Sequence, residues 1–499
     1  MKSASAGVLA AALFVAGTAS AATTSNPSDV LIKFKDASAL KAFSTMAQQG
    51  GGKVQTLGSG NWVQVKLTAT NLKQMSLKDI AKDPSVAAVQ PNYPIHLLEN
   101  YQLKDAALRA KLQKMIDGSG NPANQPAKST AAADNPAIPG AGTATGSGAD
   151  PDYSKQWGMN DIGANKSWQK SRGEQMVVAV IDTGVDYTHE DLVDNLWRNP
   201  GETGTDASGK DKATNGVDDD GNGFIDDVIG WDFATNDNKP YDLAGDPLQV
   251  IMQGMNPGHG THCAGNVGAR ADNGKGVSGV APNVKIMSMR FLTEKGQGTT
   301  AGAIQAIDYA VKMGAKVLSN SWGSEGEDSA DSAENLALRE AIQRAEAAGV
   351  LFVAAAGNGH SGVGYDNDTD AKPGYPASYD YPSIISVAAI AQDNTLGAFS
   401  NWGVKSVDIA APGVVVYSTT VGSKYADTVV DMFGIKATWD GTSMAAPHVS
   451  GAAALYWSTH PQATAAEVKA AILNSATPVP VLNGKLVTGG KLNVENLMK

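Results

Sequence analysis

The feature that most constrains the fold is the alternation of short apolar segments with amphipathic stretches after residue 150. Mostly apolar runs, typical of strands buried on both faces, occupy residues 176–181, 285–291, 316–320 and 350–355. Apolar residues at helical spacing lie between them, at 300–313 and 333–348. This order predicts an α/β fold, with a mostly parallel sheet that carries helices on both faces. Ligands of such sheets bind at the carboxyl ends of the strands.

A smaller unit precedes this region, at residues 29–100. Its pattern predicts strands at 30–34, 62–67 and 86–90 and helices at 38–49 and 72–82, which together form a compact α+β unit. Residues 101–149 then connect the two units, and from about residue 117 they are rich in Gly, Pro, Ala and Ser. This composition predicts a flexible linker. An ordered surface loop is the alternative, but loops of this length are uncommon inside compact domains.

The first residues are typical of a secretory signal peptide. Lys2 is followed by an apolar run at 7–15 and by small residues ending in Ala21, so we expect residues 1–21 to be removed after export. A membrane anchor is the alternative, but the run is shorter than the roughly 20 residues that a span needs. We therefore expect an extracellular protein, or a periplasmic one, with no membrane association after cleavage.

The net charge limits the classes of binding partner, and the cysteine content limits how the fold can be stabilised. The formal net charge of -11 disfavours binding to nucleic acid or anionic lipid. The only cysteine, Cys263, has no partner for an internal disulfide, although exported proteins commonly use disulfides for stability. We therefore expect bound metal to stabilise the protein in place of a disulfide.

Three motifs carry residues suited to chemistry. The first is Asp182-Thr183-Gly184, at the end of the run 176–181. Taken alone, it is more often a turn or helix-cap aspartate. Aspartic proteases use a similar motif, but they need two copies that share a proton, and this sequence has no second copy.

The second motif, 258–265, has glycines on both sides of His259, so backbone can pack closely around the imidazole. His262 follows three residues later, which raises the possibility of zinc. Zincins instead space their histidines four apart and place a glutamate after the first, and no such glutamate is present. We therefore expect His262 to be structural.

The third motif, Gly441-Thr442-Ser443, precedes an apolar helix that continues to about residue 456. A serine at a helix N-terminus is usually an N-cap. Together with Asp182 and His259, however, Ser443 completes a catalytic set. A serine hydroxyl needs an adjacent base to become a nucleophile, imidazole has a suitable pKa, and a carboxylate fixes the imidazole tautomer.

The three motifs, in the order Asp, His, Ser, resemble those of the subtilisin-like serine proteases, or subtilases, over residues 150–499. Residues 150–153 and 156–158, together with Cys263, look most similar to thermitase-type members. Residues 29–100, which include Val89-Gln90-Pro91-Asn92, resemble the ferredoxin-like propeptide inhibitor of the family. The resemblance implies a secreted serine endopeptidase that is made as a self-processed zymogen. Its partners would be protein or peptide substrates and its own propeptide, with the maturation site within 101–149.

The resemblance also assigns roles to residues. Ser443 would be the nucleophile that forms an acyl-enzyme, His259 the general base and Asp182 its orienting carboxylate. Asn358, in the segment 354–359, matches the asparagine that stabilises the oxyanion together with the backbone N–H of Ser443. A plain turn asparagine is the alternative for Asn358.

Three small-residue segments match the substrate-binding edges of the family. A peptide would lie between them as an added strand, with pockets for alternate side chains. Trp322 is larger than the residue common at its position. The residues assigned to substrate binding are Ser321, Trp322, Gly323, Gly296, Gly298, Ala355 and Gly357.

An acidic stretch at 218–227 is typical of a calcium loop, because oxygen-bearing side chains alternate around a central glycine. Ile229 stands where an EF-hand has its final glutamate, and Asp227 is the expected substitute. A solvated acidic turn is the alternative. The expected ligands are Asp218, Asp220, Asn222, Phe224, Asp226 and Asp227. By resemblance, Asp191 belongs to a second Ca2+ site, with other ligands near Asp272 and Asn273.

A non-catalytic, calcium-dependent binding protein with the same fold is the rival hypothesis, because fold does not fix function. The complete set of Asp182, His259, Ser443 and Asn358, together with a propeptide-like unit, counts against it.

Overall fold

The structure is a computed structural model that describes residues 28–49, 53–58, 60–67, 77–99, 101–119, 135–140, 147–324 and 335–499. The predicted signal peptide, 1–21, lies outside the described residues, as do residues 72–76 of the predicted helix at 72–82. Among the residues described, no helix combines the length and the apolar character needed to cross a bilayer.

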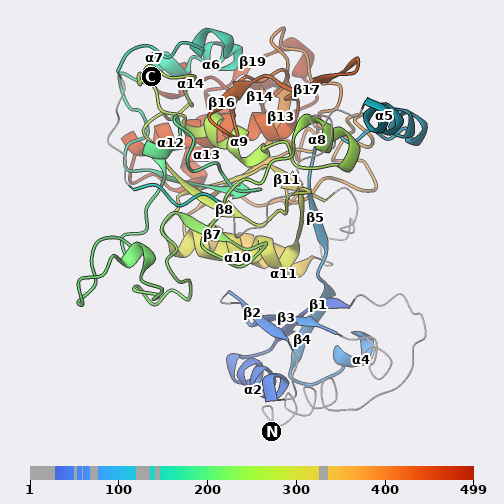
Figure 1. The fold of residues 1–499 in the computed structure, drawn as a ribbon, viewed down its shortest axis with the longest axis vertical. Helices are drawn as coiled ribbons and strands as arrows, with labels where there is room; N and C mark the ends of the chain where they lie inside the picture. The colour runs from blue at the N-terminus through green and yellow to red at the C-terminus, as the bar shows by residue number, and fades with distance from the viewer. Residues whose placement is uncertain are drawn as a thin grey trace.

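A twisted sheet forms the centre of the large unit, as the alternating apolar runs predict (Figure 1). Every neighbouring pair of its strands is parallel except β19 and β20. In spatial order the strands are β19 (Thr477–Pro478), β20 (Gly490–Lys491), β14 (Ile409–Pro412), β13 (Ile384–Ile390), β12 (Leu351–Ala355), β10 (Val317–Asn320), β6 (Val177–Asp182), β8 (Lys285–Arg290) and β7 (Gly230–Asp232).

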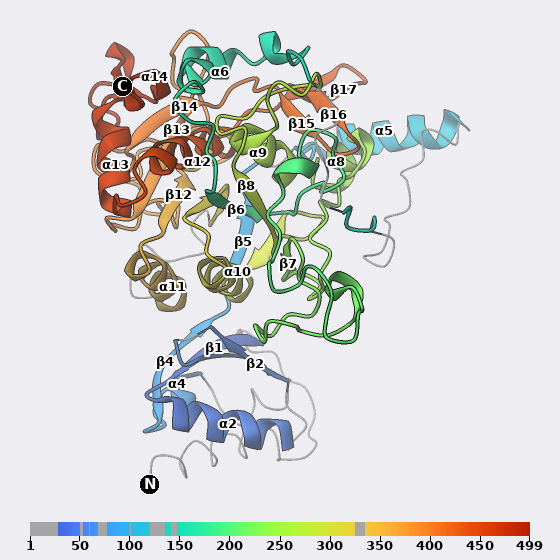
Figure 2. The same cartoon turned by 90° about the vertical axis from the view of Figure 1, so that its left-hand side faces the viewer.

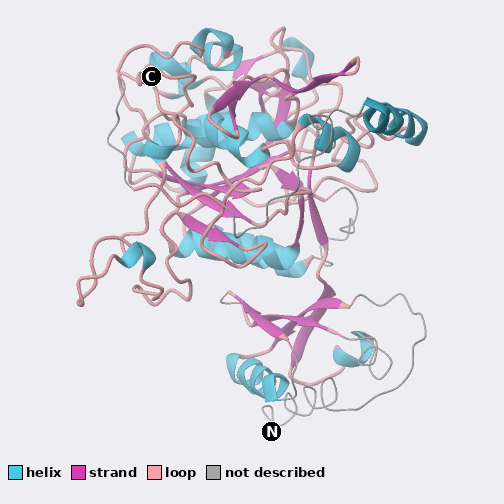
Figure 3. Cartoon of the chain, in the orientation of Figure 1, coloured by secondary structure: helices cyan, strands magenta, loops and turns pink. Residues whose placement is uncertain are grey.

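Helices cover both faces of this sheet, which confirms the predicted α/β architecture (Figure 3). One face carries α9 (His259–Gly268) and α12 (Thr442–Thr459), and the other carries α10 (Thr300–Lys312) and α11 (Leu336–Ala347). Alternate residues of β6 enter different hydrophobic clusters. Val178 and Val180 pack on the α9 and α12 side, whereas Ala179 and Ile181 pack on the α10 and α11 side. Burial on both faces is why the strand is continuously apolar.

Shorter elements complete the large unit. They are α6 (Trp157–Asp161), α7 (Ala164–Ser167), α8 (Pro247–Gln253), α13 (Ala465–Asn474), α14 (Val494–Leu497), β15 (Ser418–Thr420), β16 (Lys424–Ala426), β17 (Thr428–Met432) and β18 (Ile435–Thr438). Strands β15 and β16 form one antiparallel hairpin, and β17 and β18 form another.

The N-terminal unit has the antiparallel strand order β4-β1-β3-β2, with helices after the first and third strands, as in a ferredoxin-like fold. Its elements are β1 (Asp29–Phe34), α2 (Ala37–Gln49), β2 (Val54–Leu57), β3 (Trp62–Lys66), α4 (Leu77–Ile80) and β4 (Val86–Pro91). The sequence did not predict β2, because its four residues include only one that is buried, Leu57.

The N-terminal sheet lies against α10 and α11, which Figure 2 views end-on. The side chain of Gln90 accepts a hydrogen bond from the backbone N–H of Ala337, in the first turn of α11. Asn92 does the same for Ala301, in the first turn of α10. Two side chains of one unit therefore satisfy open N–H groups of two helices in the other.

After β4 the chain enters the large unit as β5 (Pro94–Leu97) and later forms α5 (Ala106–Ser119), a helix that the sequence did not predict. Part of the region predicted as a flexible linker lies on the large unit. Tyr187 Oη donates to the carbonyl of Pro136 at 2.7 Å, and the Arg198 guanidinium donates to that of Pro139 at 2.6 Å. Residues 135–140 are therefore fixed to its surface.

Candidate active site

The three residues predicted as catalytic meet at the carboxyl end of β6. Asp182 is the last residue of β6, His259 the first residue of α9 and Ser443 the second residue of α12, and all three are fully buried. The glycine after His259 is required by close packing, because a Cβ at Gly260 would lie 2.1 Å from the carbonyl oxygen of Gly184. The Gly-His-Gly pattern thus lets α9 begin directly against the turn that follows Asp182.

Asp182 and His259 form a direct pair, with 2.7 Å between Oδ1 and Nδ1. Burial lowers the pKa of the His259 imidazole, but the Asp182 carboxylate and the neighbouring Cys263 more than offset this effect and hold the pKa well above its usual range. The contact with Asp182 occupies Nδ1, so Nε2 is the nitrogen that faces the rest of the site.

A residue that the sequence analysis did not single out, Glu99, occupies the centre of the site. Ser443 Oγ donates to Glu99 Oε2 at 2.9 Å, and His259 Nε2 lies 3.1 Å from the same oxygen. The Glu99 side chain is only 3% exposed, and it lies two residues after β5, the strand by which the chain enters the large unit. Its carboxylate therefore stands where a reacting group would have to stand.

Asn358 holds the other oxygen of this carboxylate, because its Nδ2 donates to Glu99 Oε1 at 2.7 Å. Its orientation is fixed from behind. Asn358 Oδ1 accepts hydrogen bonds of 2.9 Å from both the backbone N–H and the hydroxyl of Thr442. Thr442 was missed as a site residue, and its place next to Ser443 in the motif was the available signal. An amide held in this way can donate to a negatively charged oxygen at the start of α12.

Asp242 links the elements that carry Asp182 and His259. Fully buried, its carboxylate accepts hydrogen bonds from the Thr183 hydroxyl, the Asn256 amide, and both the N–H and the hydroxyl of Thr261. Burial raises the pKa of Asp242 to about 6, although these donors oppose the rise. No local motif surrounds Asp242 in the sequence, and only the fold brings it behind the site.

His262 makes contacts of a buried structural histidine. One ring nitrogen, Nε2, lies 3.0 Å from the carbonyl oxygen of Val416, and the ring stacks on Trp439 at 4.2 Å between centroids. Burial lowers the pKa of His262 to about 3, so the ring is neutral. Cys263 is a free, buried thiol, 3.8 Å from Nδ1 of His259.

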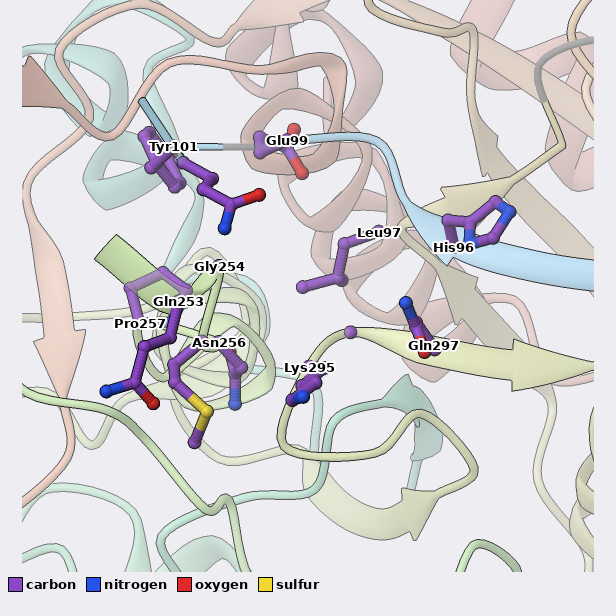
Figure 4. A pocket seen from close by; sticks show the side chains of 13 residues that line it. His96, Leu97, Glu99, Tyr101, Gln253, Gly254, Asn256, Pro257, Lys295 and Gln297 are labelled. Atoms are coloured by element: carbon purple, nitrogen blue, oxygen red, sulfur yellow. The ribbon is translucent and has the colours of Figure 1, made fainter. Parts of the chain in front are cut away.

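The predicted substrate edges flank an extended strand. β5 lies between β11 (Trp322–Gly323) and β9 (Gln297–Thr299) and is antiparallel to both. His96 stands opposite Gly323, and Ile95 opposite Gly298. The backbone N–H of Leu97 donates to the carbonyl of Gly296 at 2.9 Å. Figure 4 shows Leu97 and Glu99 following each other along this strand toward Tyr101.

The residues predicted to wall the adjacent pocket differ in what they contact. Leu98 packs into the cluster that contains Ala355, and a Cβ at Gly323 would lie 3.2 Å from its side chain. Trp322 belongs to the opposite cluster, where its ring packs on Phe291 and Phe352. The large ring of Trp322 therefore fills the hydrophobic core beneath β5.

Two further predicted positions surround the same groove. Ser321 is fully buried, and its hydroxyl donates to the backbone carbonyl of Ser443 at 2.9 Å. The N–H of Gly357 donates to the Thr442 hydroxyl at 3.2 Å. Both contacts tie the groove walls to the start of α12.

Two carboxylates of the acidic loop, Asp220 and Asp227, lie with that of Glu202 so that ligand oxygens of all three are within 4.8 Å of one another. Glu202, which precedes the loop in sequence, was not predicted. Its Oε2 is buried and has no hydrogen-bond partner among the described residues. Burial raises the pKa of both Glu202 and Asp227, and the neighbouring carboxylates raise that of Glu202 further. This donor set fits a hard cation such as Ca2+.

The other predicted loop ligands have different contacts. Asp218 accepts hydrogen bonds from the backbone N–H groups of Asn222 and Gly223, and Asp226 accepts from that of Gly216. The Asn222 side chain donates to Asp220 and Asp227. Phe224 packs edge-on against Trp231, Phe233 and Tyr309.

The predicted second Ca2+ site lies around Asp191, which is fully buried. Its carboxylate accepts hydrogen bonds from the Asn273 side chain at 2.7 Å and from the N–H of Val277 at 2.9 Å. Burial raises the pKa of Asp191 to about 7, and the charges of Asp150 and Glu190 contribute. Asp272, near which other ligands were predicted, forms an ion pair with Arg172.

Comparison with known proteins agrees with this geometry. The model of the subtilase family matches residues 173–494. Thermitase from Thermoactinomyces vulgaris is 33% identical over 331 residues, which cover 66% of this chain and 91% of thermitase. Subtilisin DY from Bacillus licheniformis is 39% identical over 220 residues, which cover 44% of this chain and 70% of that protein.

A solved structure is similar over most of the chain. Fervidolysin from Fervidobacterium pennivorans, described as a keratinolytic enzyme related to subtilisin, aligns with 94% of this chain at a TM-score of 0.63 and 25% identity. The chain spans 60% of the length of fervidolysin. The matched region includes the meeting point of Asp182, His259 and Ser443. The chain therefore belongs to the subtilase family of serine endopeptidases.

Proposed function

We propose that the protein is a secreted endopeptidase made as a self-processed zymogen, in which residues 29–100 act as an inhibitory propeptide. The observation that carries this proposal is the path of β5, which pairs with both β9 and β11 and delivers Glu99 to Ser443 and His259. A substrate that binds by strand addition would need the same place. The N-terminal unit and a substrate therefore exclude each other.

The geometry supports a defined role for each residue. Ser443 Oγ attacks the carbonyl carbon of the cleaved bond while His259 Nε2 takes its proton. The oxyanion that forms accepts hydrogen bonds from Asn358 Nδ2 and from the backbone N–H of Ser443. His259 then protonates the leaving amine, and Asp182 stabilises the imidazolium throughout. Water releases the acyl group from Ser443 by the same steps.

The register of β5 supports a first self-processing cut between Leu98 and Glu99. Leu97 and His96 pair with β11, and Leu98 packs beside Gly323 in the pocket that precedes the catalytic groups. Glu99 is the next residue and already contacts Ser443. A second cut within 101–149, where the sequence predicts maturation, would complete processing.

Ca2+ binding is part of the proposal and concerns stability. Glu202, Asp220 and Asp227 would hold one ion, and Asp191 with Asn273 would take part in a second site. The buried and unpartnered oxygen of Glu202 supports the first site most directly. A bound ion would neutralise the carboxylates that gather there.

One experiment separates this proposal from the rival binding protein. A serine-directed phosphonate should label Ser443 in the processed protein, and intact-mass and N-terminal sequencing of culture medium should find chains that lack residues 1–98. If the phosphonate leaves the processed protein unlabelled, the hypothesis of a non-catalytic binding protein is correct. Full-length protein retained inside the cells would contradict secretion and processing.

A further inference from the structure

The residues that follow Glu99 lie in a groove between α8 and the β17–β18 hairpin. The backbone N–H of Leu103 donates to the carbonyl of Ile251 at 2.9 Å, and the Gln102 side chain donates to that of Met252 at 3.2 Å. Both acceptors belong to α8. The chain is therefore held by hydrogen bonds on the leaving-group side of Ser443 as well as along β5.

Apolar contacts accompany these hydrogen bonds. The Tyr101 ring meets Trp439 edge-on, with 6.3 Å between centroids, and Trp439 is only 1% exposed. The Trp439 ring lies 6.4 Å from that of His259. Tyr101 and Leu103 also pack on one cluster, whose buried members are Leu248, Val250 and Ile251 of α8 and Val430 of β17.

The groove is built on a rigid segment that is tied to the catalytic base. Asp246 and Gln249 form a capping box at the start of α8, and Gly254 ends the helix in a left-handed conformation, with φ of 68°. The next turn contains Asn256, whose Oδ1 accepts hydrogen bonds from the N–H groups of Gly258 and His259. The position of α8 is therefore fixed relative to His259.

Figure 4 shows Tyr101 and Glu99 on one side of a cavity, with Gly254 and Asn256 of this segment on the other. The cavity has a volume of about 180 Å³. Because the opposite walls come from the N-terminal segment and from the loop that precedes α9, a peptide in this groove lies directly beside the catalytic groups.

We propose that α8 and the β17–β18 hairpin form a specificity groove for the leaving-group side of polypeptide substrates. The groove selects an aromatic residue at the third position and an aliphatic residue at the fifth position after the cleaved bond, the places of Tyr101 and Leu103. This inference rests on the proposed function and on cleavage between Leu98 and Glu99. Tyr101 Oη is buried without a partner among the described residues, so phenylalanine should bind there at least as well as tyrosine.

A cut between Leu98 and Glu99 leaves Tyr101 and Leu103 joined to the large unit, where they still fill the groove. The groove becomes available only after the second cut, within 101–149. Mature enzyme with its N-terminus beyond residue 119 is therefore the material for the test.

The test uses internally quenched peptides with the sequence of residues 94–103. Replacing the tyrosine with alanine should lower kcat/KM about tenfold, mainly through KM, and replacing the final leucine with alanine should lower it several-fold. The phenylalanine version should match or exceed the parent peptide. A peptide nitroanilide that ends at the leucine of position 98 has no residues after the cleaved bond. Its kcat/KM therefore reports only the part of the site that binds residues before that bond.

An enzyme variant completes the test. Val430→Ala should lower kcat/KM for the full-length peptide more than for the nitroanilide, whereas Val481→Ala, at a valine that is 54% exposed outside the groove, should change neither. Equal kcat/KM for the tyrosine and alanine peptides would overturn the groove while the nitroanilide is still cleaved. If no substrate is cleaved, it is the proposed peptidase function that fails.

Discussion

The Asn358 side-chain amide donates a hydrogen bond of 2.7 Å to the carboxylate of Glu99, so the proposed oxyanion donor is engaged by an anion of the same chain. The second oxygen of that carboxylate accepts from Ser443 and lies beside His259. Glu99 thus contacts the proposed nucleophile, the base and an oxyanion donor at once.

Glu99 should make self-processing depend on pH. Against the effect of burial, Asp182 and Cys263 raise the pKa of His259 above its usual range, and a protonated imidazole cannot act as a base. Processing of purified precursor should therefore accelerate as the pH rises through that raised pKa. Glu99→Gln removes an anion 3.1 Å from Nε2, which should lower the pKa and shift the profile to lower pH.

The pairing of His259 with Asp182 affects stability with a definite sign. A histidine with a raised pKa in the folded state stabilises the precursor fully below its unfolded pKa of about 6.5. This contribution to stability is lost as the pH rises through the pKa of the folded state.

The predicted pH dependence of self-processing is measured as processing rates, by gel densitometry between pH 6 and 10. If Glu99→Gln does not shift the pH profile of processing, Glu99 does not control the pKa of His259.

Ser443→Ala should accumulate as unprocessed precursor, because the proposed first cut uses the same site. Intact-mass spectrometry of purified protein measures the outcome. Active parent enzyme added to the variant should cleave it only within 101–149, whereas an unfolded variant would be cleaved throughout. Normal trimming of the variant in the absence of any parent enzyme would refute self-processing.

Asn358→Ala should lower kcat about 100- to 1000-fold with little change in KM, because one oxyanion donor is lost. Thr442→Val removes the hydroxyl that fixes the Asn358 amide and should have a smaller effect on kcat in the same direction. Steady-state kinetics on a nitroanilide peptide measure both variants. Thermal melts provide the folding control, and a kcat near that of the parent would remove Asn358 from the oxyanion site.

Calcium should stabilise the folded protein by roughly 2.7 kcal/mol at a hundredfold excess over Kd, if it binds only the folded state. Glu202→Gln combined with Asp227→Asn should abolish much of this gain, because both carboxylates belong to the cluster. Asp380→Asn, at an exposed aspartate, is the matched control. Thermal inactivation is followed with Ca2+ or with chelator, and equal rates in the parent would reject the site.

The sequence predicted the fold well where burial leaves a periodic signal. Strand β6 is apolar throughout because both of its faces are covered, and its end at Asp182 could be located for the same reason. The short strand β2 has one buried residue and gives no such signal. Helix α5 lies in a region whose composition indicated a linker, and parts of that region have fixed contacts with the large unit.

For the site, the sequence indicated residues that stand in local motifs and missed those that only tertiary structure assembles. Asp182, His259 and Ser443 meet as expected. Glu99 and Glu202 were missed, because each reaches its cluster from a segment without a motif of its own. A charged side chain that is buried by a distant strand has no periodic signature.

If residues 29–100 are the proposed inhibitory propeptide, the placement of β5 also makes enzyme activity a function of dilution. While the chain is intact, the inhibitory strand is tethered beside its groove, and its effective concentration is of the order of millimolar. The proposed cleavage between Leu98 and Glu99 would turn the same contact into an encounter between two separate molecules. Rebinding then weakens as the protein spreads away from the cell that made it, so distance from the producer would itself become an activating signal.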